Sequence, residues 1–182
     1  MKNLYIFGLG LIGGSIALKA RELSLFNKII GIGRAGGNSL QGLVESGVLD
    51  SSSTEIDQNI NEADLIIIAT PVAQIKNILQ KIKPFLNQNT IVTDVGSTKS
   101  DIMNDAKIIL EDKSHQFIGS HPIAGSEKHG PLAAKKDLFH KKNIVLTPID
   151  ENSPQKISNL IKFWKSLGGI VTKMEASEHD QI

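Results

Sequence analysis

The sequence contains no cysteine. Disulfide bonds, zinc sites built on thiolates and cysteine nucleophiles are therefore excluded. Its 20 lysines and arginines nearly balance its 19 aspartates and glutamates, so net charge gives no reason to expect nucleic acid or an acidic membrane surface as a partner. No apolar run approaches the length that a bilayer requires, and the first residues predict a strand rather than a signal peptide. We expect a soluble, cytoplasmic protein.

What the chain does have is an alternation of strand-like apolar runs and helical patterns. We predict strands at residues 4–7, 28–32, 63–70, 90–95, 116–120, 143–147 and 170–174. The continuous apolar run at 65–69 is typical of a central strand covered on both faces. Apolar residues at helical spacing predict helices over 72–82 and 157–167, with Trp164 in the core. This order predicts an α/β fold with a doubly wound, mostly parallel sheet of the Rossmann type.

A glycine motif stands between the first predicted strand and the first predicted helix. Gly8, Gly10 and Gly13 have the spacing G-x-G-x-x-G, which in this context is the fingerprint of dinucleotide binding. We expect Gly8 to permit a tight turn, Gly10 to let the backbone approach a pyrophosphate, and Gly13 to let the helix pack on the strand. Leu11 and Ile12 open the helix, whose first N–H groups attract phosphate. The alternative is a glycine-rich turn without a ligand.

The end of the second predicted strand favours NADP over NAD. A cofactor with a free ribose 2′-OH usually meets an acidic residue there, whereas this sequence has Gly33 followed by Arg34. A guanidinium can bind a 2′-phosphate through two hydrogen bonds, and Asn38 and Ser39 could add others. The alternative is that Arg34 is a solvated charge in a loop.

Three polar segments follow predicted strands, and ligands of open α/β sheets bind at those strand ends. Thr70, Pro71 and Val72 follow the central strand and are expected to cover one side of the dinucleotide. Residues 94–99 follow the next strand, where Asp94 is expected to cap a helix or hold a loop. Residues 120–130 form the third segment, which is too rich in glycine and polar residues for a mere connector.

His121 is the strongest catalytic candidate, because it stands at the end of a predicted strand before a rigid proline. Its ordinary pKa lies near physiological pH, so it can act as a general base or as a hydrogen-bond partner. Ser126 and Glu127 follow as a hydroxyl–carboxylate pair. The remaining histidines have weaker cases, and their spacing predicts no metal site: His115, His129, His140 and His179.

Segments 8–15, 94–99 and 121–127, in this order, resemble the prephenate/arogenate dehydrogenases of tyrosine biosynthesis. Residues 138–148 and 178–180 are also similar to that family, so the resemblance covers the whole chain. It implies an oxidative decarboxylation of prephenate or arogenate, in which a hydride passes to the nicotinamide and loss of carbon dioxide makes the ring aromatic.

The resemblance also implies roles for individual residues. His121 would accept a hydrogen bond or a proton from the substrate hydroxyl as that group becomes a carbonyl. Ser97 would lie against the same hydroxyl and steady the imidazole and the nicotinamide. Ser126 and Glu127 would line the substrate pocket.

Members of the family continue into a helical C-terminal domain that forms a homodimer and supplies a further histidine and an arginine to the pocket. We therefore expect residues 1–174 to be the dinucleotide-binding domain and residues 175–182 to begin a helix that leads to a missing domain. We expect this chain alone to bind NADP with little or no dehydrogenase activity. Two alternatives remain open: another reductase of the Rossmann superfamily, and a non-catalytic NADP-binding module that needs a separate partner.

Overall fold

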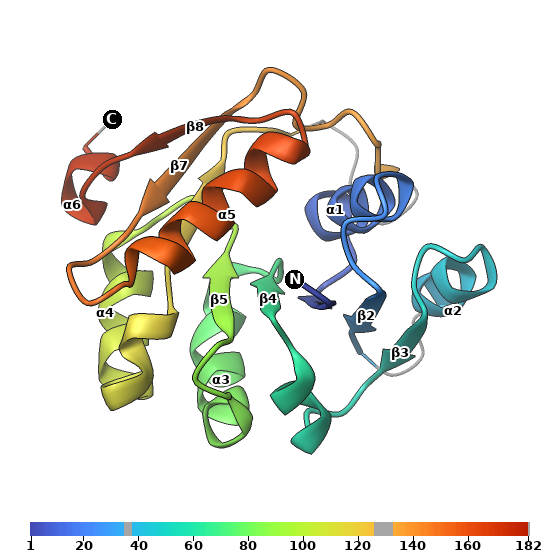
Figure 1. Cartoon of the computed structure of the whole chain (residues 1–182), viewed down its shortest axis with the longest axis horizontal. Helices are drawn as coiled ribbons and strands as arrows, with labels where there is room; N and C mark the ends of the chain where they lie inside the picture. The colour runs from blue at the N-terminus through green and yellow to red at the C-terminus, as the bar shows by residue number, and fades with distance from the viewer. Residues whose placement is uncertain (35–37, 126–132, 182) are drawn as a thin grey trace.

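The computed structural model describes residues 1–34, 38–125 and 133–181, without the side chains of residues 38 and 39. A parallel sheet of five strands forms its centre, in the order β3-β2-β1-β4-β5 (Figure 1). This is the doubly wound order that the alternation of strands and helices predicted. The strands are β1 (Asn3–Phe7), β2 (Lys28–Ile32), β3 (Ser51–Ser53), β4 (Leu65–Ile68) and β5 (Ile91–Asp94).

The last three strands form a second, smaller sheet. They are β6 (Gly119–Pro122), β7 (Asn143–Thr147) and β8 (Ile170–Lys173). β6 runs antiparallel to β7, whereas β7 and β8 are parallel. A single parallel bridge from Val92 to Phe117 joins the chain before β6 to β5. The two sheets therefore diverge from a shared edge, a division that the alternating pattern of the sequence does not reveal.

Helices cover both faces of the five-stranded sheet, as Figure 1 shows. Three of them pack against one face together with β7: α1 (Leu11–Glu22), α2 (Asn38–Glu45) and α5 (Pro154–Ser166). Two pack against the other face: α3 (Val72–Ile82) and α4 (Ser100–Leu110). Within the described residues no helix is long and apolar enough to cross a membrane.

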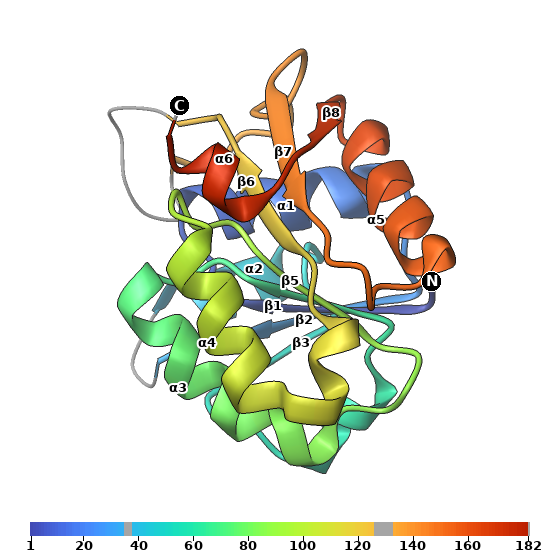
Figure 2. The ribbon, with the colours of Figure 1, turned by 90° about the vertical axis from the view of Figure 1, so that its left-hand side faces the viewer.

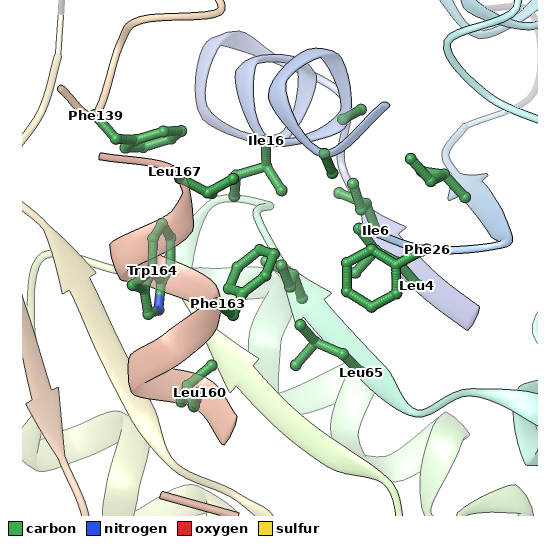
Figure 3. Packing of buried hydrophobic residues seen from close by; sticks show 14 of the residues in the cluster. Leu4, Ile6, Ile16, Phe26, Leu65, Phe139, Leu160, Phe163, Trp164 and Leu167 are labelled. Atoms are coloured by element: carbon green, nitrogen blue, oxygen red, sulfur yellow. The ribbon is translucent and has the colours of Figure 1, made fainter. Parts of the chain in front are cut away.

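The larger apolar cluster joins the two sheets (Figure 3). Trp164 of α5 is fully buried, as predicted, and its ring packs edge-on against Phe139 at a centroid distance of 5.5 Å. The indole N–H donates to Ser120 Oγ at 3.2 Å. That hydroxyl lies 2.6 Å from Thr93 Oγ1 of β5. α5, β6 and β5 are thus connected by one buried line of polar and aromatic contacts.

Several predicted elements have different limits in the structure. β3 was not predicted, because Ser51–Ser53 carries no apolar residue. The predicted strand at 63–70 shortens to β4, whose four residues are all buried. The strand predicted at 116–120 is wrong in its limits: β6 extends to Pro122, so His121 lies within a strand and pairs with Val145.

The end of the described chain packs against α4. Residues Ala176–His179 form the short helix α6, which lies beside β6 and above the start of α4 in Figure 2. The Asp180 carboxylate accepts the backbone N–H groups of Lys99 and Ser100, each at 2.8 Å. One turn of helix is unstable by itself, so these contacts with the first turn of α4 account for its order.

Candidate functional site

A cleft of about 1100 Å³ lies beyond the carboxyl ends of β1, β2 and β4. This is the position at which doubly wound sheets bind ligands. Five of the predicted cofactor residues line it: Gly8, Gly10, Arg34, Thr70 and Pro71. Four others follow these within three positions of the chain without lining the cleft: Leu11, Ile12, Gly13 and Val72. Ser39 belongs to α2, and its side chain lies outside the described part of the chain.

The glycine turn has the geometry that a close backbone approach requires. Gly8 has a φ of +85°, a region that favours glycine, and a Cβ there would lie 2.8 Å from the Ala69 carbonyl oxygen. A Cβ on Gly13 would lie 1.9 Å from the Gly8 carbonyl oxygen. A Cβ on Gly10 would meet nothing within 4 Å, so the backbone at Gly10 opens onto free space in the cleft.

Two groups around this turn suit a phosphate-bearing ligand. Helix α1 starts at Leu11, and within the described residues no side chain caps its N-terminus at Gly10. Its first N–H groups have no partner inside the helix. Thr70, whose side chain lies beside Gly8, also lines the cleft. Free donors and a glycine cradle therefore fit a dinucleotide.

The cleft is lined by charged side chains of both signs. Arg34 and Lys81 line it, and so does Glu55, which follows β3. Gly33 lines the cleft next to Arg34, in place of the acidic residue that usually binds a free ribose 2′-OH. Sequence reasoning missed Glu55 and Lys81, since β3 was not predicted and Lys81 belongs to a helix read only for its apolar face.

A buried ion pair organises the neighbouring loop. Lys99 Nζ donates to Asp94 Oδ2, and both side chains are fully buried. Asp94 also accepts the N–H groups of Gly96 at 2.8 Å and Ser120 at 3.1 Å. Lys99 in turn donates to the Ser120 carbonyl oxygen at 2.8 Å. Asp94 therefore holds a loop, one of the two roles that the sequence predicted for it.

Burial opposes both charges of this pair. It raises the pKa of the Asp94 carboxyl, and it lowers the pKa of the Lys99 ammonium, each against the attraction of the partner. The pair encloses the backbone of Ser120, the residue before His121, and closes the loop that carries Ser97. The two predicted catalytic residues thus belong to segments that one ion pair holds together.

His121 is half-buried, and its Nδ1 atom lies 2.8 Å from Nε2 of His179. Burial, with the neighbouring His179 and Lys99, lowers the pKa of His121 against the opposing pull of Asp180. A lowered pKa keeps the imidazole neutral at physiological pH, the form that a base requires. Sequence reasoning gave His179 a weak case, and the structure places its ring against that of His121.

Three other residues were predicted for catalysis or substrate binding: Ser97, Ser126 and Glu127. Ser97 is exposed in the loop between β5 and α4. Ser126 and Glu127 lie outside the described residues. In the parts of the chain that the structure describes, no group of three or more histidine, aspartate or glutamate side chains could hold a metal ion.

The model of one protein family matches residues 16–173 of this chain, the family described as the nucleotide-binding domain of prephenate dehydrogenase. The prephenate dehydrogenase of Bacillus subtilis is 35% identical over 99% of this chain and 48% of its own length. The cyclohexadienyl dehydrogenase of Zymomonas mobilis is 30% identical over the whole chain and 61% of its own length. The chain thus spans about half to three fifths of these curated relatives.

Solved structures agree with the sequence relatives. The prephenate dehydrogenase of Aquifex aeolicus, in complex with hydroxyphenyl propionate and NAD+, superposes with a TM-score of 0.90 at 31% identity. That match covers 99% of this chain and 62% of the other. The arogenate dehydrogenase of Synechocystis gives a TM-score of 0.89 at 30% identity, over 98% of this chain and 62% of the other. The chain therefore belongs to the prephenate dehydrogenase family, of which it contains the nucleotide-binding domain.

Proposed function

We propose that the cleft binds a nicotinamide dinucleotide and that it prefers NADP to NAD. The observation that carries the first part is the glycine turn, where the backbone at Gly10 faces open space at the N-terminus of α1. A pyrophosphate placed there would meet free N–H groups and the positive end of the helix. Thr70 and Pro71 would cover the other side of the cofactor.

The preference for NADP rests on the charged residues that line the cleft. Arg34 and Lys81 supply two cations to it, whereas Glu55 supplies one carboxylate. A 2′-phosphate would bind the guanidinium through charge-assisted hydrogen bonds. Gly33 also stands at the strand end where an acidic residue usually binds a free ribose 2′-OH, and Arg34 follows it.

For the whole protein we propose the oxidative decarboxylation of prephenate or arogenate. The reaction is assigned to the whole protein because the relatives are longer than this chain. When bound, the nicotinamide would supply the hydride acceptor. His121 would take the proton of the substrate hydroxyl, and Ser97 would lie against that hydroxyl. We propose Ser126 and Glu127 as substrate-binding residues and a homodimer formed through the rest of the protein.

Calorimetric titration of the chain with NADP and NAD tests the cofactor proposal. We expect both to bind, NADP more tightly. Arg34→Gln should weaken NADP binding by about tenfold to a hundredfold, the value of one charge-assisted hydrogen bond, and leave NAD nearly unchanged. Glu55→Gln is the matched control, because it neutralises the opposite charge in the same cleft. Glu55→Gln should not weaken the binding of NADP.

The two parts of the proposal fail in different ways. Equal affinity for the two cofactors, or tighter NAD binding, would overturn the role of Arg34 and favour Glu55 as the partner of the ribose. A folded chain that binds neither would overturn the assignment of the cleft itself.

A further inference from the structure

A series of hydrogen bonds connects His121 to the C-terminal end of the described residues. His121 Nδ1 lies 2.8 Å from His179 Nε2. His179 Nδ1 lies 2.7 Å from Asp180 Oδ1. The two imidazole rings meet edge-on, with centroids 5.1 Å apart and planes at 72°. Each ring nitrogen on this path thus has one partner, and the path ends at a carboxylate.

The Asp180 carboxylate determines the direction of every hydrogen bond in this series. Burial by itself would raise the pKa of Asp180, but hydrogen bonds from His179, Ser100 and Lys99 hold it far below its usual range. Asp180 is therefore ionised and can only accept hydrogen bonds. It accepts the backbone N–H groups of Lys99 and Ser100 on its two oxygens, so its own position is fixed.

The protons of both rings follow from this acceptor. His179 must carry a hydrogen on Nδ1 to donate to Asp180, and in its neutral form its Nε2 atom then has a lone pair. That lone pair accepts a hydrogen bond, so His121 must carry its hydrogen on Nδ1. The Nε2 atom of His121 is left without a hydrogen.

We propose that His179 and Asp180 are positioning residues that hold His121 in the Nδ1–H tautomer and relay the proton that His121 takes up. Nε2 of His121 is then the basic atom that faces the substrate. The proposal depends on the proposed function only for the source of that proton, the substrate hydroxyl.

The relay conserves protons and charge. When the substrate O–H bond breaks, a bond forms between the proton and His121 Nε2; a bound nicotinamide would supply the acceptor for the hydride. The Nδ1–H bond of His121 then breaks as a bond forms between that proton and His179 Nε2. The positive charge moves onto His179, where the Asp180 carboxylate lies 2.7 Å from Nδ1. His121 returns to the neutral state.

The charges around His121 favour this transfer. Lys99 and His179 both disfavour a positive charge on His121, and Asp180 favours it from the far side of His179. Another charged group, Asp94, is bonded to Lys99. A charge that moves from His121 to His179 therefore moves toward the carboxylate.

Nitrogen-15 NMR of the histidine rings tests the proposal, because protonated and unprotonated ring nitrogens have well-separated shifts. The measurement uses the protein without ligand near neutral pH. The signals are assigned with variants that each lack one histidine. We expect His121 and His179 both to be protonated at Nδ1 and unprotonated at Nε2. The opposite tautomer at His121 would overturn the proposal, whether or not any variant folds.

Two variants separate the hydrogen bond from packing. His179→Phe keeps an aromatic ring against His121 but removes the acceptor, so we expect the Nε2–H tautomer of His121 to become populated. Glu178→Gln, an exposed neighbour in α6, is the control and should leave the His121 signals unchanged. A folded His179→Phe protein with an unchanged His121 tautomer would refute the relay.

The outcome is independent of the cofactor. Because the tautomer is measured without nucleotide, a chain that binds no dinucleotide can still support the relay. A chain that binds NADP with the wrong tautomer would reject the relay and leave the proposed function standing.

Discussion

A methyl group on Gly13 would lie 1.9 Å from the Gly8 carbonyl oxygen, a distance at which one of the two backbones must move. We expect Gly13→Ala to lower the free energy of unfolding by about 1–3 kcal/mol, the usual cost of overpacking. The displaced turn should also weaken dinucleotide binding by about tenfold or more. Urea unfolding and calorimetric titration measure the two effects.

Gly42 provides a control for the same change in a helix. It lies in α2, and a Cβ there would meet nothing within 4 Å. Gly42→Ala should therefore stabilise the chain by up to about 1 kcal/mol and leave binding unchanged. If Gly13→Ala bound nucleotide as tightly as the unaltered chain, the close packing of α1 on the glycine turn would not matter for the site.

Three elements meet at one buried ion pair. Asp94 is the last residue of β5, Lys99 directly precedes α4, and both bond the backbone of β6 at Ser120. Removal of one member leaves an uncompensated charge in the interior. We expect Lys99→Met to lower the free energy of unfolding by about 3–5 kcal/mol. The loss should be visible as a lower midpoint in urea.

A second substitution shows whether the unpaired charge of Asp94 causes the loss of stability in Lys99→Met. Asp94→Asn in the Lys99→Met background removes the unpaired charge and keeps an oxygen acceptor, so the double variant should be more stable than Lys99→Met alone. Lys107→Met, at an exposed position of α4, should change stability by less than about 0.5 kcal/mol. Equal losses at Lys99 and Lys107 would argue against a structural role for the pair.

The two sheets share one apolar cluster, which extends from β1 and β4 through α5 to β7. We therefore expect the whole molecule to unfold as one cooperative unit. Trp164 is the only tryptophan of the chain and lies where the sheets meet, so its fluorescence reports the second sheet and α5. Its midpoint in urea should equal that of far-ultraviolet circular dichroism, and the two should shift together in Lys99→Met.

Separate transitions in this experiment would have a simple meaning. If fluorescence changed at a lower urea concentration than circular dichroism, the part around β7 and α5 would be an independent unit. The cleft, which is built on the first sheet, would then keep its ability to bind nucleotide after that first transition.

The sequence by itself determined the features that depend on short stretches of chain. The glycine turn was predicted, the helix α3 was predicted with its correct limits, and the buried strand β4 was predicted with the correct type but two residues too long at each end. The reason is that hydrophobic period and glycine spacing are local properties, visible within one element. His121 could be singled out in the same way, from its neighbours in the chain.

The tertiary structure alone decided what depends on residues far apart in the chain. β3 exists because β2 offers it a partner, not because of its own side chains. His121 and His179 are 58 positions apart, and no local pattern predicts that their rings meet. The same holds for the cleft, where Glu55 joins Arg34 only after β3 has paired. Such contacts follow from strand order and from the divergence of the two sheets, which only the packing of the complete domain determines.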